Sequence, residues 1–200
     1  MSKPLSSSAV EAIVHRITEI AVKKGLEDWE TQIEFVSSIG EGRVSVARSA
    51  EEVDAFWDRE AYLEVTTEVQ RNAEGAVRLF FSMESAWPIV REALCMPSSA
   101  ELGEEGTLTD AQLDAFKEMM NLLCGSANAV YQQFGMQLSQ SVDSLSVVQR
   151  QPGAPENIRG LVIAMPYTIN GADSREIIQV LSAPVAIAIA EAVHSHRAAA

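Results

Sequence analysis

A carboxylate and a carboxamide stand one helical turn apart in this chain, at Glu118 and Asn121. A carboxamide can hold a water molecule, because it both donates and accepts hydrogen bonds. A carboxylate can pair with a lysine of another molecule, although an exposed pair adds little affinity by itself. A second carboxylate, Asp114, precedes Glu118 by four residues. These residue types favour chemistry on a group that another molecule brings to them.

The three residues belong to one long predicted helix, residues 109–134, which Thr109 and Gln112 would begin as a capping box. Polar or small residues recur at intervals of four, three, four and three and so share one face, the polar strip: Asp114, Glu118, Asn121, Gly125 and Asn128. The opposite face is apolar and can pack on a sheet: Leu113, Phe116, Met120, Leu123, Ala127, Val130 and Phe134. By residue type alone, the strip is also what the solvated side of an ordinary amphipathic helix contains.

Two apolar residues and a glycine at the strip point to a docking surface. Leu122 borders the strip and Met119 lies at its outer margin. Charged residues at such positions would cost less free energy than exposed apolar ones. Gly125 is in mid-helix, where glycine costs about 1 kcal/mol relative to alanine, and it would let another surface come close. We therefore expect Met119, Leu122 and Gly125 to contact a docked partner.

The composition is that of an acidic globular protein. The chain has 200 residues, of which 47% are hydrophobic, and a formal net charge of −13. This charge argues against nucleic acid or an anionic membrane surface as a partner. No apolar run approaches the roughly 20 residues needed to cross a bilayer, and MSKPLSSSAV lacks the apolar core of a signal peptide. We therefore expect a cytoplasmic protein that does not insert into membranes.

The cysteines and histidines show no pattern of a metal site. Cys95 and Cys124 fall in apolar helical contexts without metal-ligand or redox spacing, so we expect buried free thiols. His15, His194 and His196 do not assemble a recognisable ligand set. The sequence therefore predicts no metal bound by this chain.

The predicted elements occur in the same order in two halves, residues 8–95 and 107–195: a helix, then strands, then a helix. The first helix begins at Ser8 and is expected to end at Lys23-Lys24-Gly25. Residues 174–181 and 184–194 close the second half, most simply as helical pieces. The strand at 75–82 would then correspond to a strand at 160–166 in the second half.

The correspondence between the two halves also pairs residues of the two long helices. A shift of ninety-nine residues places three residues of the first helix opposite the strip: His15, Glu19 and Val22 face Asp114, Glu118 and Asn121. We predict a single domain, 1–200, of α/β (α+β) class, in which the pseudo-repeats form one mixed or antiparallel sheet. The two long helices would lie side by side on one face of that sheet.

The motif Asp114-x3-Glu118-x2-Asn121, continuing into Gly125-Ser-Ala, resembles the active-site helix of the CheC/CheX/FliY family of chemotaxis phosphatases. The approach Thr107-Leu-Thr-Asp110 and the segment 76–94 also look like that family, and the resemblance extends over residues 60–195. It implies a CheC-like fold. It also implies a hydrolase of two-component signalling, which removes phosphate from the aspartyl phosphate of the response regulator CheY.

The resemblance implies a role for each strip residue. Asn121 would orient a water for in-line attack on the phosphoaspartate, as glutamine does in GTPases. Glu118 would bind a lysine in the active site of the regulator, and Asp114 would be an accessory polar contact. The Mg²⁺ would belong to the partner receiver domain, so this chain would need no cofactor of its own.

Two positions depart from the family pattern. The family has a proline 23 residues after the asparagine, where this chain has Ser144. In the first half, Val22 would stand where a carboxamide is required, so that half would be an inactive site.

Two other interpretations remain open. One is a non-catalytic scaffold on the same fold, as in the flagellar switch, which would hold a partner through Met119 and Leu122. The other, a small-molecule-binding domain, has little support because no glycine-rich phosphate loop is visible. The sequence also leaves open which receiver is the partner and whether the chain forms a homodimer.

Overall fold

A computed structural model describes residues 5–33, 37–47, 61–71, 75–102, 106–136, 138–149, 160–171 and 175–199. The sequence also predicts a short helix at 51–57, and these residues lie outside the part of the chain that the structure describes. The elements are α1 (Ser7–Gln32), β1 (Ser37–Ile39), β2 (Arg43–Ala47), β3 (Ala61–Arg71), β4 (Gly75–Ser82), α3 (Met83–Ala93), α4 (Asp110–Gln133), β5 (Leu138–Gln149), β6 (Gly160–Ile169), β7 (Arg175–Leu181) and α5 (Ala183–Ala199).

The strands form one seven-stranded sheet in the order β1-β6-β7-β4-β3-β5, and β2 also pairs with β6. Every pairing is antiparallel. The central pair is β7 with β4, in which Val77 faces Leu181 and Phe81 faces Ile177. Outward from this pair, β5 of the second half flanks β3, whereas β1 and β2 of the first half flank β6. The α+β class and the single sheet built from two halves are therefore confirmed.

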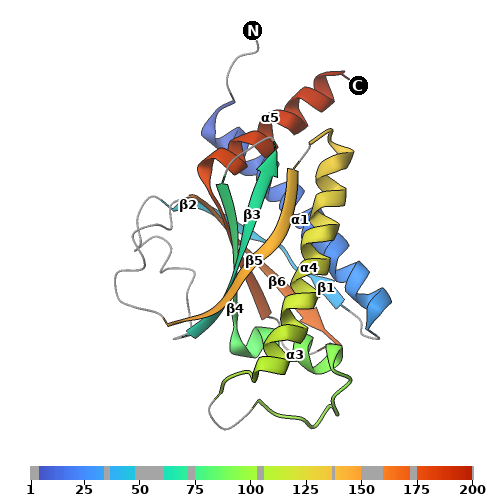
Figure 1. The fold of residues 1–200 in the computed structure, drawn as a ribbon. Helices are drawn as coiled ribbons and strands as arrows, with labels where there is room; N and C mark the ends of the chain where they lie inside the picture. The colour runs from blue at the N-terminus through green and yellow to red at the C-terminus, as the bar shows by residue number, and fades with distance from the viewer. Residues whose placement is uncertain are drawn as a thin grey trace.

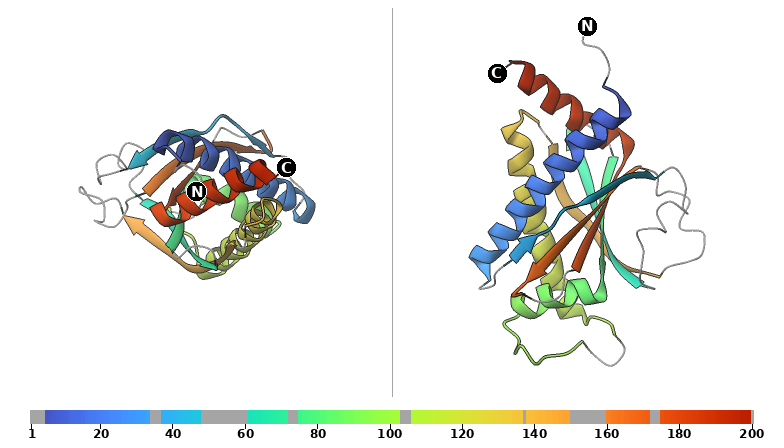
Figure 2. Two further views of the ribbon diagram at one scale, coloured as in Figure 1. Left: turned by 90° about the horizontal axis from the view of Figure 1, so that it is seen from above. Right: turned by 180° about the vertical axis from the view of Figure 1, so that it is seen from behind.

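The long helices α1 and α4 cover one face of the twisted sheet, with α5 at one end and α3 at the other (Figures 1 and 2). The main core lies between these helices and the sheet and contains Trp29, Leu63, Phe81, Phe116 and Ile163, each 0% exposed. A smaller cluster is buried on the opposite face of the sheet: Tyr62, Phe80, Val162, Ala164, Ile178 and Val180.

The predicted helical piece at 174–181 is wrong, because residues 175–181 form the central strand β7. Its apolar residues are buried on both faces of the sheet, so they lack the alternation that marks a half-buried strand. The assignment of β7 also changes how the halves correspond. The strand that precedes α3 is β4 and the strand that precedes α5 is β7, so 75–82 matches 175–181 rather than 160–166.

The predicted end of the first helix at Gly25 is also wrong, because α1 continues to Gln32. Gly25 lies where α1 packs against α4, and a β-carbon there would lie 2.2 Å from Cδ1 of Leu123. This glycine therefore permits a close approach of two helices instead of ending one of them.

Candidate functional site

Helix α4 presents the strip, and its start is as predicted. The Thr109 amide donates to Oε1 of Gln112 at 2.8 Å, and the Leu113 amide donates to the Thr109 carbonyl at 2.9 Å. The predicted apolar face packs inward: Phe116 lies edge-to-face on Phe81, with ring centroids 5.1 Å apart. Burial of this face on the sheet holds the other face outward.

The first four strip residues, Asp114, Glu118, Asn121 and Gly125, are exposed. Three or four residues of separation on a helix makes side chains neighbours, so Glu118 lies beside both Asp114 and Asn121. Within the part of the chain that the structure describes, the side chains of Glu118 and Asn121 make no hydrogen bond or ion pair. Their polar atoms are therefore available to another molecule.

The fifth strip residue, Asn128, has a structural role instead. Its Nδ2 donates to the Gln140 carbonyl at 2.9 Å, and its Oδ1 accepts from the Gln140 amide at 2.7 Å. Asn128 thus satisfies the main chain of β5 and ties α4 to the sheet.

Of the predicted docking residues, Leu122 and Gly125 are on the surface and Met119 is not. Leu122 is 38% exposed, and a β-carbon on Gly125 would have no atom within 4 Å. Met119 is 4% exposed and belongs to the core cluster, so its expected position at the outer margin is wrong. It faces inward because α1 packs against that side of α4. A buried side chain cannot dock a partner.

Two hydrogen bonds connect α1 to the part of α4 that carries the strip, on the side of α4 that faces away from solvent. Nε1 of Trp29 donates to the Met119 carbonyl at 2.9 Å, and the Ser126 hydroxyl donates to Oδ2 of Asp28 at 2.6 Å. Trp29 meets Met119 whereas Gly25 meets Leu123, so the two helices run antiparallel. The sequence prediction missed these residues because it ended the first helix before them.

The Asp28 carboxylate contacts two groups at this junction. It pairs with Lys24 on its own helix and accepts from Ser126 on α4. The hydrogen bonds from Lys24 and Ser126 lower the pKa of the Asp28 carboxyl, more than its partial burial raises it. Ser126, part of the Gly-Ser-Ala continuation of the motif, therefore serves to join α4 to α1.

Burial corrects the register in which the halves correspond. Val22 is 5% exposed, so it cannot be the counterpart of exposed Asn121. A shift of 102 residues instead superposes the buried faces, since Val14, Ile17, Ala21 and Trp29 then match Phe116, Met119, Leu123 and Tyr131.

In this register the counterparts of Glu118 and Asn121 are Arg16 and Glu19. These two residues form an ion pair with each other, 2.7 Å between Nη1 and Oε2. The first half still lacks a carboxamide, but the residue in its place is Glu19 and not Val22.

Ser144, where the family pattern has proline, lies in β5 opposite Thr66. The register of β5 against β3 shifts between Thr66 and Thr67, which marks a β-bulge beside Ser144. Bulges and edge strands are where a sheet tolerates proline, and β5 is an edge strand. The strand therefore forms here without the proline.

The two cysteines differ in exposure. Cys124 is buried as expected, and burial raises the pKa of its thiol to about 12, so it stays protonated at neutral pH. Cys95 is exposed, contrary to expectation, because α3 ends at Ala93 just before it. Among the described residues, no group of three or more His, Cys, Asp or Glu could hold a metal ion. No helix in the described part of the chain is long and apolar enough to span a membrane.

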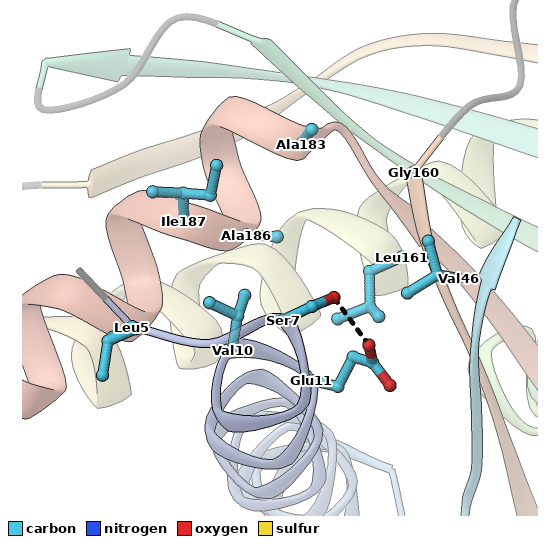
Figure 3. Close-up of a pocket in the computed structure, with 10 residues that line it drawn as sticks. All are labelled: Leu5, Ser7, Val10, Glu11, Val46, Gly160, Leu161, Ala183, Ala186 and Ile187. Carbon is cyan, nitrogen blue, oxygen red and sulfur yellow. Dashed lines mark hydrogen bonds between the residues drawn. The ribbon is translucent and has the colours of Figure 1, made fainter. Parts of the chain in front are cut away.

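A groove of about 550 Å³ lies apart from the strip, between the starts of α1 and α5 and the neighbouring ends of β2 and β6 (Figure 3). Most of its lining is apolar: Leu5, Val10, Val46, Leu161, Ala186 and Ile187. The Ser7 hydroxyl donates to Oε1 of Glu11 at 3.0 Å on one wall. None of the strip residues lines this groove, so the two features are separate.

No family model matches this sequence, and no curated protein matches it. Solved structures do match the fold. FliY from Thermotoga maritima has a TM-score of 0.76 at 17% identity, over 96% of this chain and 98% of that chain. FliM in the FliG–FliM complex from H. pylori has a TM-score of 0.69 at 10% identity, over 94% and 100%. The chemotaxis protein CheX from Desulfovibrio desulfuricans has a TM-score of 0.56 at 16% identity, over 84% and 99%. At such identities the similarity is one of fold, and the chain has the CheC-like fold.

Proposed function

We propose that this protein is a phosphatase that hydrolyses the aspartyl phosphate of a CheY-like receiver domain in chemotaxis signalling. The observation that supports it most is the pair Glu118 and Asn121, exposed side by side on α4 and without partners in the described part of the chain. A free polar pair on a convex helix suits a macromolecular substrate that brings its own reacting group.

Each residue of the pair has one task in this proposal. The side chain of Asn121 holds a water in line with the phosphorus, where its oxygen forms the new P–O bond. The bond from phosphorus to the aspartyl oxygen breaks, which releases inorganic phosphate and the free carboxylate. Glu118 binds a lysine of the receiver and so places Asn121, and Asp114 adds a polar contact. The receiver holds the Mg²⁺ that neutralises the phosphoryl charge.

Phosphate release from a phosphorylated receiver tests the proposal, with Asn121→Ala as the central variant. We expect the rate to fall on the order of 100-fold, because the attacking water is no longer oriented. Glu118→Ala is expected to raise KM, because the contact with the receiver is lost. Glu27→Ala, at an exposed position of α1, is the control and should retain full activity. Full activity of Asn121→Ala would contradict the assignment.

The second candidate is a non-catalytic binding protein on the same fold. The similarity to FliM in the FliG–FliM complex favours it, and so does Glu19, a carboxylate where the first half would need a carboxamide to match Asn121. It would use Leu122 and the open position at Gly125 to hold a partner. Binding to phosphorylated and unphosphorylated receivers, measured together with phosphate release, separates the two. Binding without release favours the scaffold, whereas release that depends on Asn121 favours the enzyme.

A further inference from the structure

The main-chain carbonyl between Glu118 and Asn121 has a second, buried hydrogen-bond donor. In an α-helix the Met119 carbonyl accepts from the amide four residues on, and a carbonyl oxygen has a second lone pair. Nε1 of Trp29, which is 0% exposed, donates to this oxygen at 2.9 Å. The contact joins α1 directly to the turn that carries the catalytic pair.

Apolar packing fixes the position of this turn less strictly than a hydrogen bond does. The side chains that it buries are Met119 and Met120, and methionine is unbranched and adapts to irregular spaces. Apolar burial is also non-directional, whereas a hydrogen bond weakens steeply when its angle is wrong. The indole bond therefore adds to this turn a directional contact that apolar packing does not provide.

Two other contacts between α1 and α4 lie farther along the helix. Gly25 packs against Leu123, and Asp28 accepts from Ser126. Both lie C-terminal to Asn121 on α4, so neither holds the peptide groups between the two catalytic residues.

We propose that Trp29 is a positioning residue for the Glu118–Asn121 pair, an inference that rests on the proposed function. Its indole N–H holds the turn so that Asn121 places water on the phosphoryl group of a docked receiver. Helix α1 has Glu19 and no carboxamide at the counterpart of Asn121. In this proposal it still contributes to the reaction, because Trp29 holds α4 in position.

The test removes the N–H and keeps the ring. Trp29 is replaced by 3-benzothienylalanine, in which sulfur stands in place of the indole N–H, and in a second variant by phenylalanine. The expected result is a fall in kcat of about threefold to tenfold with KM for the phosphorylated receiver little changed, because small misplacements of a reacting group are costly. A rise in KM with kcat unchanged, or no change in either constant, would overturn the proposal.

Tyr167→Phe is the matched control. It removes a bond of the same kind, since the Tyr167 hydroxyl donates to the Ser85 carbonyl at 2.5 Å in the core, but this bond joins β6 to α3 and involves neither α1 nor α4. We expect this variant to lose stability and keep its kcat. An equal loss of kcat in Tyr167→Phe would mean that destabilisation alone explains the effect, and would overturn the proposal.

A readout without activity separates this inference from the proposed function. Hydrogen exchange of the amides at 118–124 should be faster in both Trp29 variants and unchanged in Tyr167→Phe. Unchanged exchange in the Trp29 variants would overturn the positioning role. If the natural protein released no phosphate, the proposed function would fail, and the exchange result would still decide whether Trp29 holds this turn.

Discussion

The two long helices are the same element in the two halves of the fold, and they differ almost entirely on their exposed faces. Toward the core, Val14 and Ile17 of α1 match Phe116 and Met119 of α4 as buried apolar residues. Toward solvent, α1 carries Arg16 and Glu19, paired with each other at 2.7 Å. In the same places α4 carries Glu118 and Asn121, which have no partner among the described residues. Packing against the sheet constrains the buried faces alike, whereas the exposed faces are free to differ. The proposed site therefore lies on α4 and has no equivalent on α1.

Exchanging one residue between the helices should give the largest effect. Asn121→Glu gives α4 the residue of α1, and we expect phosphatase activity to fall about 100-fold or more, because a carboxylate cannot donate a hydrogen bond to the water. The measurement is phosphate release from a phosphorylated receiver. Glu19→Asn, introduced into the Asn121→Ala background, should restore nothing, because Arg16 stands in place of Glu118. Rescue by that variant would mean that α1 can also form a site.

Alanine substitutions at Met119 and Leu122 should affect different properties, the stability of the fold and the binding of the receiver. Met119→Ala is expected to lower the free energy of unfolding by about 2–5 kcal/mol, since it leaves a cavity in the core. Leu122→Ala should cost less than about 1 kcal/mol because Leu122 is partly exposed. Urea unfolding measures both changes. Receiver binding should weaken in Leu122→Ala; if only Met119→Ala weakened it, the docking role of Leu122 would be refuted.

The mid-helix glycines should respond in opposite directions. Gly125→Ala is expected to raise stability by about 1 kcal/mol, because the added methyl meets no atom within 4 Å and alanine is the better helix former. Gly25→Val should lower stability by about 1–3 kcal/mol, because its side chain would overlap Leu123. Thermal or urea unfolding gives both signs. A more stable Gly125→Ala that also binds the receiver less well would support close approach at this position.

The link between Asp28, Lys24 and Ser126 should give a small dependence of stability on pH. The folded-state pKa of Asp28 lies below its usual value of 3.8, so its contribution is fully present above that value. As the pH falls below 3.8, the unfolded chain binds the proton first, and the contribution is lost on passing through the folded-state pKa. Half-exposed pairs contribute less than about 1 kcal/mol.

Asp28→Asn and the natural protein are therefore compared by urea unfolding at pH 6 and at about pH 3. Their stabilities should differ at pH 6, and the difference should be smaller at the lower pH, where the unfolded chain already binds the proton. A difference that is the same at both pH values would show that the carboxylate charge is not what joins the helices.

Much of the fold could be predicted where signals are local. The capping box at Thr109 and Gln112 marks the start of α4. The dipeptide Asn170-Gly171 is typical of a hairpin turn, and both of its residues have positive φ at the end of β6. The errors share a cause. The local sequence predicts a helix end at Gly25 and a helix at 174–181, whereas α1 continues through Gly25 and 175–181 form β7, because distant parts of the chain pack against both segments.

The sequence alone determined which residues could do chemistry and that they share one face of α4, since helical periodicity depends only on spacing. Tertiary structure decided which residues next to that face are exposed to solvent and which are buried. Packing of α1 against α4 buries Met119, leaves Leu122 and Gly125 at the surface, and assigns Glu19 rather than Val22 as the counterpart of Asn121. Only the antiparallel crossing of the two helices brings the indole of Trp29 to the Met119 carbonyl, ninety residues away in the chain.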